Sequence, residues 1–367
     1  MKKIYTLIIL LSITFGFSQP PAGYYATATG TGYILKTQLF NIIKNNTNAA
    51  SSSSNYGALW TLFQQPAYRD NYYENDSSLM DVYSEKPNVA DAYNYTSSSQ
   101  QCGIYSGEGV CYNREHTMPQ YIWGSAYPMY SDAHFVLPTD GYVNGKRDNF
   151  PYGMVNGAQA INFTSTNGSR LGQNTNAGYA AGYTGTVFEP INEFKGDIAR
   201  CLLYFATRYE DQITGWNYVM YNGTSTQVFT DTFKNILLIW NDLDPVSPYE
   251  IAKNNRVFQF QGNRNPYIDN NSYVHTVWGP SLNTTTFEAF NHVSVFPNPT
   301  NENKIQIQTE NSIDSIELYN LNGQLIESVK NPKKLENSYL LENLNQGFYL
   351  LKLTSDNQTL TRKVIVN

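Results

Sequence analysis

Two short polar segments of the chain carry the residue types that hydrolysis of a phosphodiester requires. Glu115 and His116 are neighbours in the first segment, and Asn149 ends the second. An imidazole with an ordinary pKa of about 6.5 is largely neutral above pH 7 and can take a proton from water. The carboxylate of Glu115 and the amide oxygen of Asn149 are hard ligands suited to Mg²⁺. A base for water and a divalent ion on the phosphate together favour a nuclease.

Cationic side chains flank these residues. Arg114, Lys146 and Arg147 are candidates to contact substrate phosphates, and the alternative is that they are ordinary solvated charges. Mg²⁺ takes few protein ligands and keeps several waters, so a two-ligand site on Glu115 and Asn149 is sufficient.

The spacing of the residues constrains the local structure. Neighbouring side chains on a regular strand point to opposite faces, so Glu115 and His116 reach one phosphate only if the strand ends or bulges there. Pro119 agrees with a strand end. Asp132 and His134 are two residues apart, which would place both on one face of a second strand. A turn at residues 139–141 then opens a short helix.

The order strand, strand, short helix resembles the ββα finger of the endonuclease I family of His-Me finger (ββα-metal) nucleases. The resemblance covers roughly residues 25–280 in separated blocks. The matching blocks are Cys111–Gln120, Asp132–His134, Pro138–Asn149, Phe194–Arg200 and Gln261–Tyr267. The sequence differs from the family pattern at Ala133, Phe135 and Val136, which puts the fine positioning of the second strand in question.

The resemblance implies roles for individual residues. His116 is the general base, and Glu115 and Asn149 hold one divalent ion, usually Mg²⁺, with Mn²⁺ or Ca²⁺ as alternatives. Arg200 resembles a phosphate-binding arginine, the alternative being a salt bridge on its own helix. The family cleaves DNA, and often RNA, with little sequence preference and leaves 5′-phosphate ends. Asp132 and His134 are interpreted as positioning residues that hydrogen-bond around the finger.

The cysteines indicate an oxidising compartment. Cys102 and Cys111 close a short loop that contains three glycines, and we predict a disulfide between them. It would fix the approach to Glu115 and His116. Cys201 lies in an apolar helical run and is predicted to be a buried free thiol.

The chain has 367 residues, enough for one to three domains, and a formal net charge of -6. A protein that binds nucleic acid through its overall charge is normally basic. An acidic nuclease must instead rely on a local cationic groove and a metal ion.

The N-terminus predicts secretion. A basic Met1–Lys3 precedes an apolar run that ends at Phe17, which is typical of a signal peptide over residues 1–18. The run is short for a membrane anchor, which is the alternative. No later segment approaches eighteen apolar residues, so no membrane span is expected in the mature protein.

Helices are expected within residues 35–45, 193–210 and 230–240, with another starting at residues 247–250. Residues 58–63 are expected to form a helix or a short strand. From residue 293 the pattern alternates as in strands and predicts a small β-sandwich. This end resembles the type A sorting domain of the type IX secretion system. An accessory carbohydrate-binding sandwich is the alternative.

The sequence therefore predicts an α+β protein, with a mainly helical nuclease domain around a ββα-metal finger (19–290) and an all-β sandwich (293–367). The expected function is an exported, divalent-metal-dependent, sequence-non-specific endonuclease acting on DNA, with RNA as a further candidate substrate. The alternatives are a secreted ribonuclease of the same family and a catalytically inactive surface binding protein. Its expected partners are nucleic acid and the type IX secretion machinery, and a monomer is the default expectation.

Overall fold

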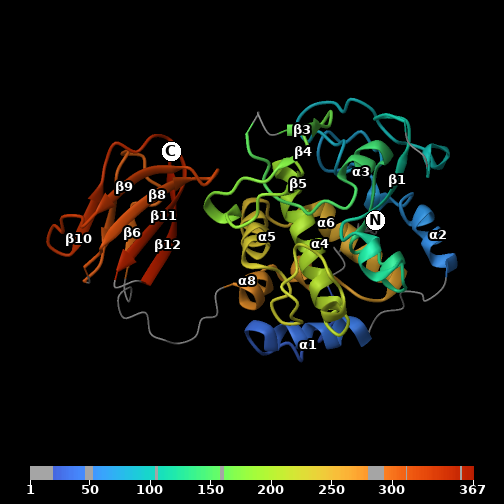
Figure 1. Cartoon of the computed structure of the whole chain (residues 1–367), viewed down its shortest axis with the longest axis horizontal. Helices are drawn as coiled ribbons and strands as arrows, with labels where there is room; N and C mark the ends of the chain where they lie inside the picture. Colours follow the sequence, from blue (N-terminus) through green and yellow to red (C-terminus); the bar gives the residue numbers. More distant parts are fainter. Residues whose placement is uncertain are drawn as a thin grey trace, which may run out of the picture. The chain divides into compact units, whose positions relative to one another are not determined.

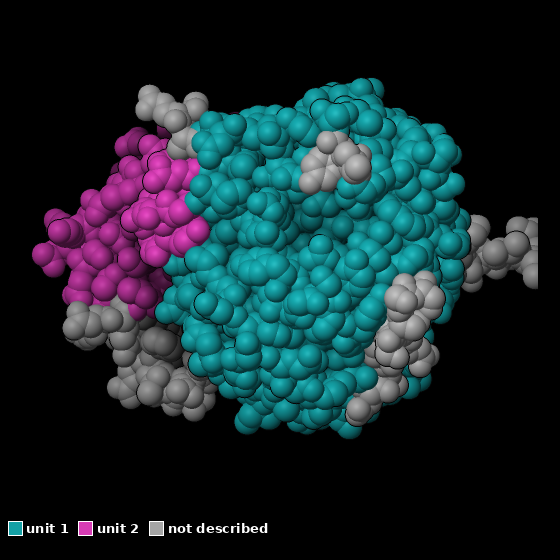
Figure 2. Space-filling view, turned by 45° about the vertical axis from the view of Figure 1, so that its right-hand side comes forward, with its two compact units in different colours: residues 1–155, 161–172, 186–279 teal, residues 156–160, 173–185, 280–367 magenta. Residues whose placement is uncertain are grey.

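The computed structural model describes residues 20–45, 53–103, 106–157, 161–279, 293–310, 312–355 and 358–367. The predicted signal peptide, residues 1–18, lies outside these residues. The chain divides into two compact units, coloured separately in Figure 2: residues 1–155, 161–172 and 186–279 in the first, and 156–160, 173–185 and 280–367 in the second. No helix among the described residues is long and apolar enough to cross a membrane.

The first unit contains the predicted finger. Strand β1 (Tyr112–His116) pairs antiparallel with β2 (Val136–Asp140), with Glu115 opposite Leu137, and α3 (Gly141–Arg147) follows at once (Figure 1). Asp140 caps this helix, because its Oδ1 accepts the backbone N–H groups of Tyr142 and Val143, both at 2.8 Å. The strand, strand, helix order predicted from the sequence is therefore present.

Helix α4 (Lys195–Arg208) is the centre of the first unit. Every one of its residues is buried, and α5 (Asp231–Leu243) and α1 (Gly32–Asn45) pack against it (Figure 1). A helix that is buried all round must neutralise its polar side chains internally. It does so through buried ion pairs, of which Lys195 with Glu189 at 2.7 Å is one.

The remaining elements of the first unit surround these parts. The helices are α2 (Ser53–Leu62), α6 (Pro248–Gln261), α7 (Pro266–Asp269) and α8 (Ser272–Trp278), and the strands β3 (Ile161–Thr164), β4 (Arg170–Gln173) and β5 (Thr186–Glu189) form a three-stranded sheet. Short 3-10 helices include η3 (Gln120–Trp123) and η4 (Met129–Ser131). Helices α1, α4, α5 and α6 lie where the sequence predicted helices, and α2 is a helix where a helix or a short strand was expected. Helices α7 and α8 were not predicted.

The C-terminal part of the second unit is a β-sandwich, as predicted. One sheet has the order β10-β7-β6 and the other β12-β11-β8-β9. The strands are β6 (Ser294–Phe296), β7 (Ile305–Gln308), β8 (Ser315–Asn320), β9 (Leu325–Lys330), β10 (Ser338–Leu341), β11 (Gly347–Ser355) and β12 (Gln358–Val366). Alternate residues of both sheets, such as Ile307 and Leu351, fill one shared core.

One local prediction was wrong. Asp132 and His134 do not share a strand face, because β2 begins only at Val136. They lie in the turn that leads from η4 into β2. The backbone N–H of Val136 donates to the Asp132 carbonyl at 3.1 Å, so this segment turns before it extends.

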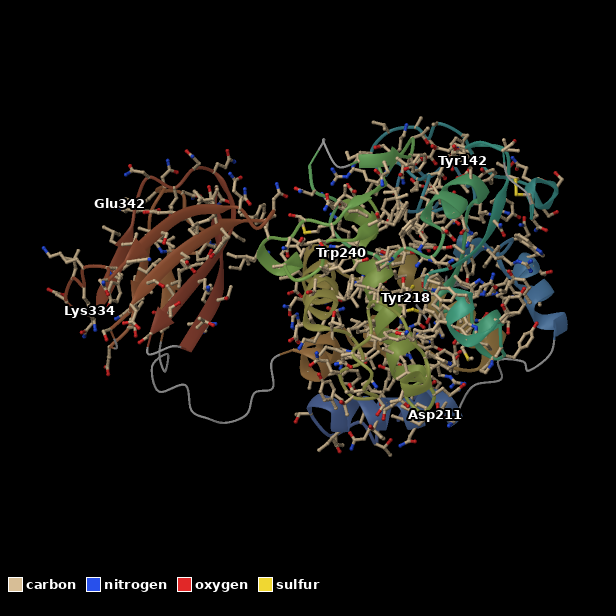
Figure 3. The ribbon with its side chains drawn as sticks, in the orientation of Figure 1. Tyr142, Asp211, Tyr218, Trp240, Lys334 and Glu342 are labelled. Atoms are coloured by element: carbon tan, nitrogen blue, oxygen red, sulfur yellow. A yellow bond between two sulfur atoms is a disulfide. The ribbon has the colours of Figure 1, made fainter. Side chains whose placement is uncertain are left out.

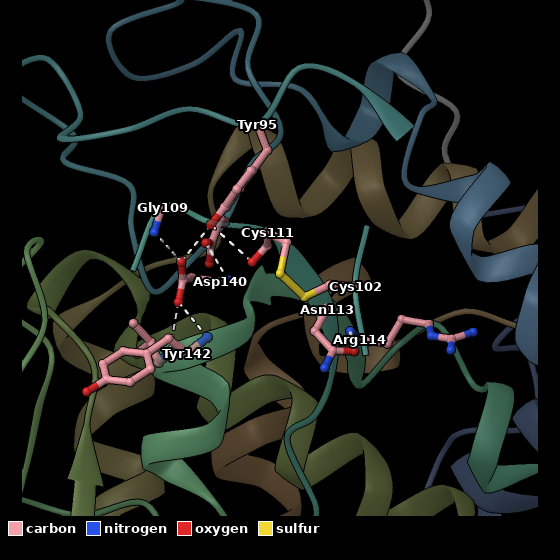
Figure 4. The surroundings of a disulfide bond; sticks show 10 residues. Tyr95, Cys102, Gly109, Cys111, Asn113, Arg114, Asp140 and Tyr142 are labelled. Carbon is pink, nitrogen blue, oxygen red and sulfur yellow. Dashed lines mark hydrogen bonds between the residues drawn. A yellow bond between two sulfur atoms is a disulfide. The ribbon is translucent and has the colours of Figure 1, made fainter. Parts of the chain in front are cut away.

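The predicted disulfide is present. Cys102 and Cys111 are bonded, with their Cα atoms 5.7 Å apart, and Cys201 is a buried free cysteine as expected. Figure 4 shows the disulfide beside Asp140, whose Oδ2 accepts the Tyr95 hydroxyl at 2.6 Å and the Gly109 N–H at 2.8 Å. Gly109 belongs to the loop that the disulfide closes. The covalent bond therefore restrains a loop that holds the N-cap of α3.

Replacing both cysteines by serine should lower the free energy of unfolding by about 2–3 kcal/mol, because the loop is released in the unfolded chain. The measurement is urea unfolding of the double variant against the oxidised parent. The parent in a reducing agent should shift by a similar amount, and Cys201→Ser in the same assay is the control for a thiol without a partner. An unchanged midpoint for the double variant would show that the loop is held by its other contacts alone.

Candidate active site

A polar cleft of about 280 Å³ lies at the finger, within the first unit. Its lining includes Glu115 and His116 from β1 and Asn149 from the segment after α3, so the structure brings the three predicted central residues together. Arg114, from the same strand, lines it as well. The other lining residues are Tyr56, Gly103, Asn113, Pro119, Gln120, Asn144, Gly145, Arg147 and Asp148.

Glu115 is a buried carboxylate with its contacts concentrated on one oxygen. Its Oε1 accepts the hydroxyls of Tyr83 at 2.9 Å and Tyr152 at 3.1 Å, and it lies 3.0 Å from NH1 of Arg147. Burial raises the pKa of Glu115, while Arg147 and the two tyrosines act in the opposite direction. Among the described residues none donates a hydrogen bond to Oε2. This arrangement leaves one oxygen available to a cation.

His116 is positioned as a base by a backbone carbonyl. Its Nε2 lies 3.2 Å from the carbonyl oxygen of Tyr130, and because a carbonyl can only accept, Nε2 must carry the proton. The lone pair is then on Nδ1. The ring stacks on that of Tyr130, with centroids 5.5 Å apart and planes 6° apart, which fixes its orientation.

The environment of His116 keeps its imidazole neutral. Burial is the largest effect and lowers the pKa of His116 to about 4, with smaller contributions from the positive charges of Arg114 and Arg147. The carbonyl of Tyr130 opposes the shift. At neutral pH the imidazole is therefore uncharged and can accept a proton.

Asn149 lies where α3 ends. Asp148 closes the helix with φ of 48°, in the left-handed region that few residues other than glycine adopt, and turns the chain toward the cleft. The Asn149 Nδ2 donates to the Asp148 carboxylate at 3.0 Å, and Tyr218, labelled in Figure 3, donates to the Asn149 carbonyl at 3.2 Å. The amide oxygen of Asn149 can then face a ligand.

The donor set of the cleft fits a hard divalent cation. The carboxylate oxygen Oε2 of Glu115 and the amide oxygen of Asn149 are the ligand types that Mg²⁺ prefers. The buried charge of Glu115 is shared among Arg147 and two phenols rather than neutralised at both oxygens. A cation in the cleft would complete this compensation, since buried charges require partners.

Arg114 is the predicted phosphate contact that lies best for that role. Its guanidinium stacks on the rings of Tyr56 and Trp60, with its central carbon 3.4 and 4.2 Å from their centroids, and NH1 donates to the Tyr56 carbonyl at 2.7 Å. These contacts hold the group at the cleft wall, and no acidic side chain among the described residues forms an ion pair with it. Lys146, in contrast, lies over the rings of Tyr142 and Phe163 and does not line the cleft.

Arg147 has a structural role instead of the phosphate contact that we expected. It is 1% exposed, and its NH1 and NH2 donate to the carbonyls of His116 and Thr117 at 2.9 and 2.6 Å. NH1 also forms the ion pair with Glu115. Arg147 therefore joins the end of α3 to the end of β1 and holds Glu115 and His116 in place.

Arg200 also differs from the expectation of a phosphate contact. Its exposed fraction is 0%, and Nε and NH2 form a bidentate pair with Glu250 at 2.6 and 2.7 Å. NH1 donates to Asn241 and to the carbonyl of Asp244. The guanidinium is thus fully occupied in joining α4 to α5 and α6, and solvent-borne phosphate cannot reach it.

Asp132 and His134 connect the turn before β2 to the helices. Asp132 Oδ2 accepts the hydroxyls of Tyr204 and Tyr209 at 2.9 and 2.8 Å, and His134 Nε2 contacts the Asn263 carbonyl at 3.0 Å. No hydrogen bond in the described part of the chain links either side chain to Glu115 or His116. Both side chains therefore anchor the segment that leads into β2 to the helical part of the first unit.

Sequence reasoning missed the tyrosines of the site. Tyr83 and Tyr152 share the Oε1 of Glu115, and Tyr130 supplies the carbonyl for His116. With 30 tyrosines in the chain, nothing in composition or spacing distinguishes these three. The missed signal for Arg147 was its place in the last turn of the short helix, two residues before the predicted ligand Asn149.

Comparisons with known proteins agree with this geometry. The family model described as endonuclease I matches residues 31–272, which is more than half of the chain. The chain is 28% identical over 262 residues to an extracellular ribonuclease of Bacillus amyloliquefaciens, covering 70% of this chain and 78% of that protein. Over 274 residues it is 26% identical to an extracellular ribonuclease of Bacillus subtilis (strain 168), with the same coverage of each protein. An endonuclease-1 of Buchnera aphidicola subsp. Acyrthosiphon pisum is 26% identical over 143 residues, 39% of this chain and 46% of that protein.

A second family model covers the β-sandwich. It is described as a secretion system C-terminal sorting domain and matches residues 294–367. The chain is thus a secreted protein whose C-terminal domain carries the sorting signal, in agreement with the type IX secretion tail expected from the sequence.

The structure predicts different results for two arginine variants. Arg200→Ala should lower the free energy of unfolding by about 3–5 kcal/mol, because it leaves the Glu250 carboxylate buried without its partner. Arg114→Ala should change stability less and should reduce the slope of log K for nucleic acid against log salt by about one. The measurements are urea unfolding and a salt titration of binding. A stable Arg200→Ala protein with weakened salt-dependent binding would restore the phosphate role of Arg200.

Proposed function

Because the chain belongs to the endonuclease I family, we propose that it is a divalent-metal-dependent endonuclease that hydrolyses phosphodiester bonds of nucleic acid without sequence preference. The observation that carries the proposal is the pair of free acceptors in one cleft. Nδ1 of His116 has its lone pair because Nε2 is bound to a carbonyl, and Oε2 of Glu115 is left open while Oε1 holds three donors. One acceptor suits a proton and the other a metal ion.

The residues of the cleft have separate tasks in this reaction. Water attacks phosphorus, and Nδ1 of His116 takes the proton that the water gives up. The bond from phosphorus to the 3′-oxygen breaks, and the leaving oxygen takes a proton from solvent water, which leaves a 3′-hydroxyl and a 5′-phosphate. Arg114 binds a phosphate oxygen of the substrate strand, and Tyr56 and Trp60 support its guanidinium. Glu115 and Asn149 would hold a divalent ion, which neutralises charge on the phosphate and on the leaving oxygen.

The cleft favours a substrate that is recognised by its backbone. Its lining is polar, and its one cationic group outside the internal network of Arg147 is Arg114, among the residues that the structure describes. Contacts to phosphate carry no sequence information, so cleavage should be independent of base sequence. The chain's net charge of -6 excludes strong binding by overall electrostatics, so affinity should depend on the ion and on this local contact.

RNA is a second candidate substrate beside DNA. Two of the relatives are named extracellular ribonucleases and another endonuclease-1. Both nucleic acids present the same phosphodiester to His116 and Arg114. We therefore propose cleavage of both, and the secreted location suits the degradation of nucleic acid outside the cell.

The test incubates the secreted chain with supercoiled plasmid and, in parallel, with ribosomal RNA in Mg²⁺. Both should be cleaved, EDTA should stop cleavage, and His116→Ala should reduce the rate by about 10²–10⁴-fold because the base is lost. Glu115→Gln should raise the Mg²⁺ concentration needed for half-maximal activity. His275→Ala, an exposed histidine outside the cleft paired with Asp242, is the matched control and should retain full activity.

Circular dichroism of each variant verifies folding in this experiment. A folded parent that cleaves neither substrate with any divalent ion would contradict the nuclease proposal and would favour a catalytically inactive binding protein. Cleavage of RNA alone would restrict the function to a ribonuclease.

The lowered pKa of His116 gives the pH profile a definite sign. Only neutral His116 acts as the base, and a pKa of about 4 instead of the ordinary 6.5 means that the neutral form persists to lower pH. We expect kcat/KM at saturating Mg²⁺ to stay level between pH 8 and 6, with the loss of activity only in more acid solution. An acid limb centred near pH 6.5 would contradict a buried, neutral imidazole.

A further inference from the structure

A group of carboxylates converges in the segment from residue 70 to residue 91, apart from the cleft. Carboxylate oxygens of Asp70, Glu74 and Glu85 all lie within 4.8 Å of one another. A second group shares Glu74 and adds Asp76 and Asp91 at the same spacing. Five acidic side chains of a 22-residue stretch therefore face each other in two overlapping triads.

Two of the five have no hydrogen-bond partner for either oxygen. All four carboxylate oxygens of Glu74 and Glu85 are buried and unsatisfied, and Glu85 as a residue is 1% exposed. The other three have donors. Asp70 accepts the backbone N–H groups of Tyr72 and Tyr73 at 2.9 Å through Oδ1 and that of Asn75 at 2.6 Å through Oδ2. Asp76 likewise accepts hydrogen bonds at both oxygens, and Asp91 accepts the backbone N–H of Lys86 at 2.6 Å through one. Buried carboxylates without donors are rare because they lose hydration and gain nothing in return.

No positive side chain compensates this charge. None of the ion pairs in the described part of the chain involves any of the five carboxylates. Either protons or a metal ion must therefore balance the group.

We propose that Asp70, Glu74 and Glu85 form a Ca²⁺ site that is separate from the catalytic cleft. The unpartnered oxygens of Glu74 and Glu85 are its principal ligands, and Asp70 adds a third carboxylate. Asp76 and Asp91 contribute negative charge through the triad that shares Glu74.

The ligands select Ca²⁺ over Mg²⁺. Ca²⁺ takes six to eight oxygens and accepts carboxylates that bind through both oxygens in irregular geometry. Mg²⁺ demands a near-ideal octahedron and keeps several waters, whereas the oxygens of Glu74 and Glu85 are closed off from solvent. Extracellular Ca²⁺ modules bind with dissociation constants of about 10⁻⁴–10⁻³ M, a range that suits a secreted protein.

The site is linked to the catalytic cleft by a short buried segment. Glu85 is two residues from Tyr83, whose hydroxyl donates to Oε1 of Glu115 at 2.9 Å. Asp81, in the same segment, accepts the backbone N–H of Asp140 at 2.6 Å through Oδ2. Residues 81–85 are all buried. Ca²⁺ at Glu85 would thus fix the segment that orients the catalytic carboxylate.

The test measures Ca²⁺ binding directly, by isothermal titration of the EGTA-stripped chain with CaCl₂ alone. The parent and Glu115→Gln should both bind Ca²⁺ at this site, while Glu85→Gln and Glu74→Gln should weaken it at least tenfold. Glu193→Gln, an exposed acid in the same unit, is the matched control and should bind as the parent does. The same titration with MgCl₂ should show weaker binding at the site.

Thermal unfolding distinguishes a bound Ca²⁺ ion from protons as the charge that balances the carboxylates. In EGTA, Glu85→Gln should be as stable as the parent or more stable, because it removes a buried, unbalanced acid. At a Ca²⁺ concentration tenfold above the dissociation constant the parent should gain stability and Glu85→Gln should not, so the parent becomes the more stable protein. Absence of Ca²⁺ binding by the folded parent, or equal binding by Glu85→Gln, would overturn the proposal in favour of protonated carboxyl groups. Neither result depends on nuclease activity, so failure of the proposed function would be visible separately.

Discussion

The structure of the cleft depends on the burial of one carboxylate. Glu115 is 2% exposed, and a charge so placed is tolerated only with partners of good geometry. The protein supplies an arginine and two phenols, all at the same oxygen. Those partners come from two separate stretches of the chain, at residue 83 and at residues 147–152, so the requirement to stabilise this group brings distant parts of the first unit together.

Arg147 shows how the finger is closed around that group. It contacts Glu115 with one nitrogen and the carbonyls of His116 and Thr117 with two. The two carbonyls belong to the last residue of β1 and to the residue that follows it, so Arg147 binds the backbone where the strand ends. The end of the strand also resolves a geometric difficulty, since both Glu115 and His116 line one cleft although adjacent strand residues ordinarily point apart.

The sequence predicted much of the fold, for physical reasons that differ between elements. The helices from α4 to α6 were recognisable by apolar periodicity and by signals such as Ser247, which caps α6 with Glu250 in a capping box. The disulfide followed from a short spacing and the glycines between the cysteines. Glu115, His116 and Asn149 were recognisable because their chemistry is unusual in one short region, and their catalytic roles stay a proposal.

The partners of charged side chains were harder to predict from the sequence than the fold was. Nothing in the local sequence distinguishes Arg147 and Arg200 from Arg114. In the structure Arg147 binds the Glu115 carboxylate and two backbone carbonyls, and Arg200 binds Glu250. Whether an arginine meets solvent or a buried acid depends on tertiary packing, which local sequence does not encode. The same holds for Glu85, whose isolation from every donor arises only when residues far apart fold over it.

The carbonyl behind His116 has a kinetic consequence. A backbone oxygen orients the ring but carries no full negative charge, so it cannot retain a proton on the imidazole as a carboxylate partner would. With a pKa of about 4, the protonated ring is a fairly strong acid, and only about a thousandth of it persists at pH 7. As the proposed general base, His116 would therefore pass its proton to water after each cleavage, without a dedicated group to accept it.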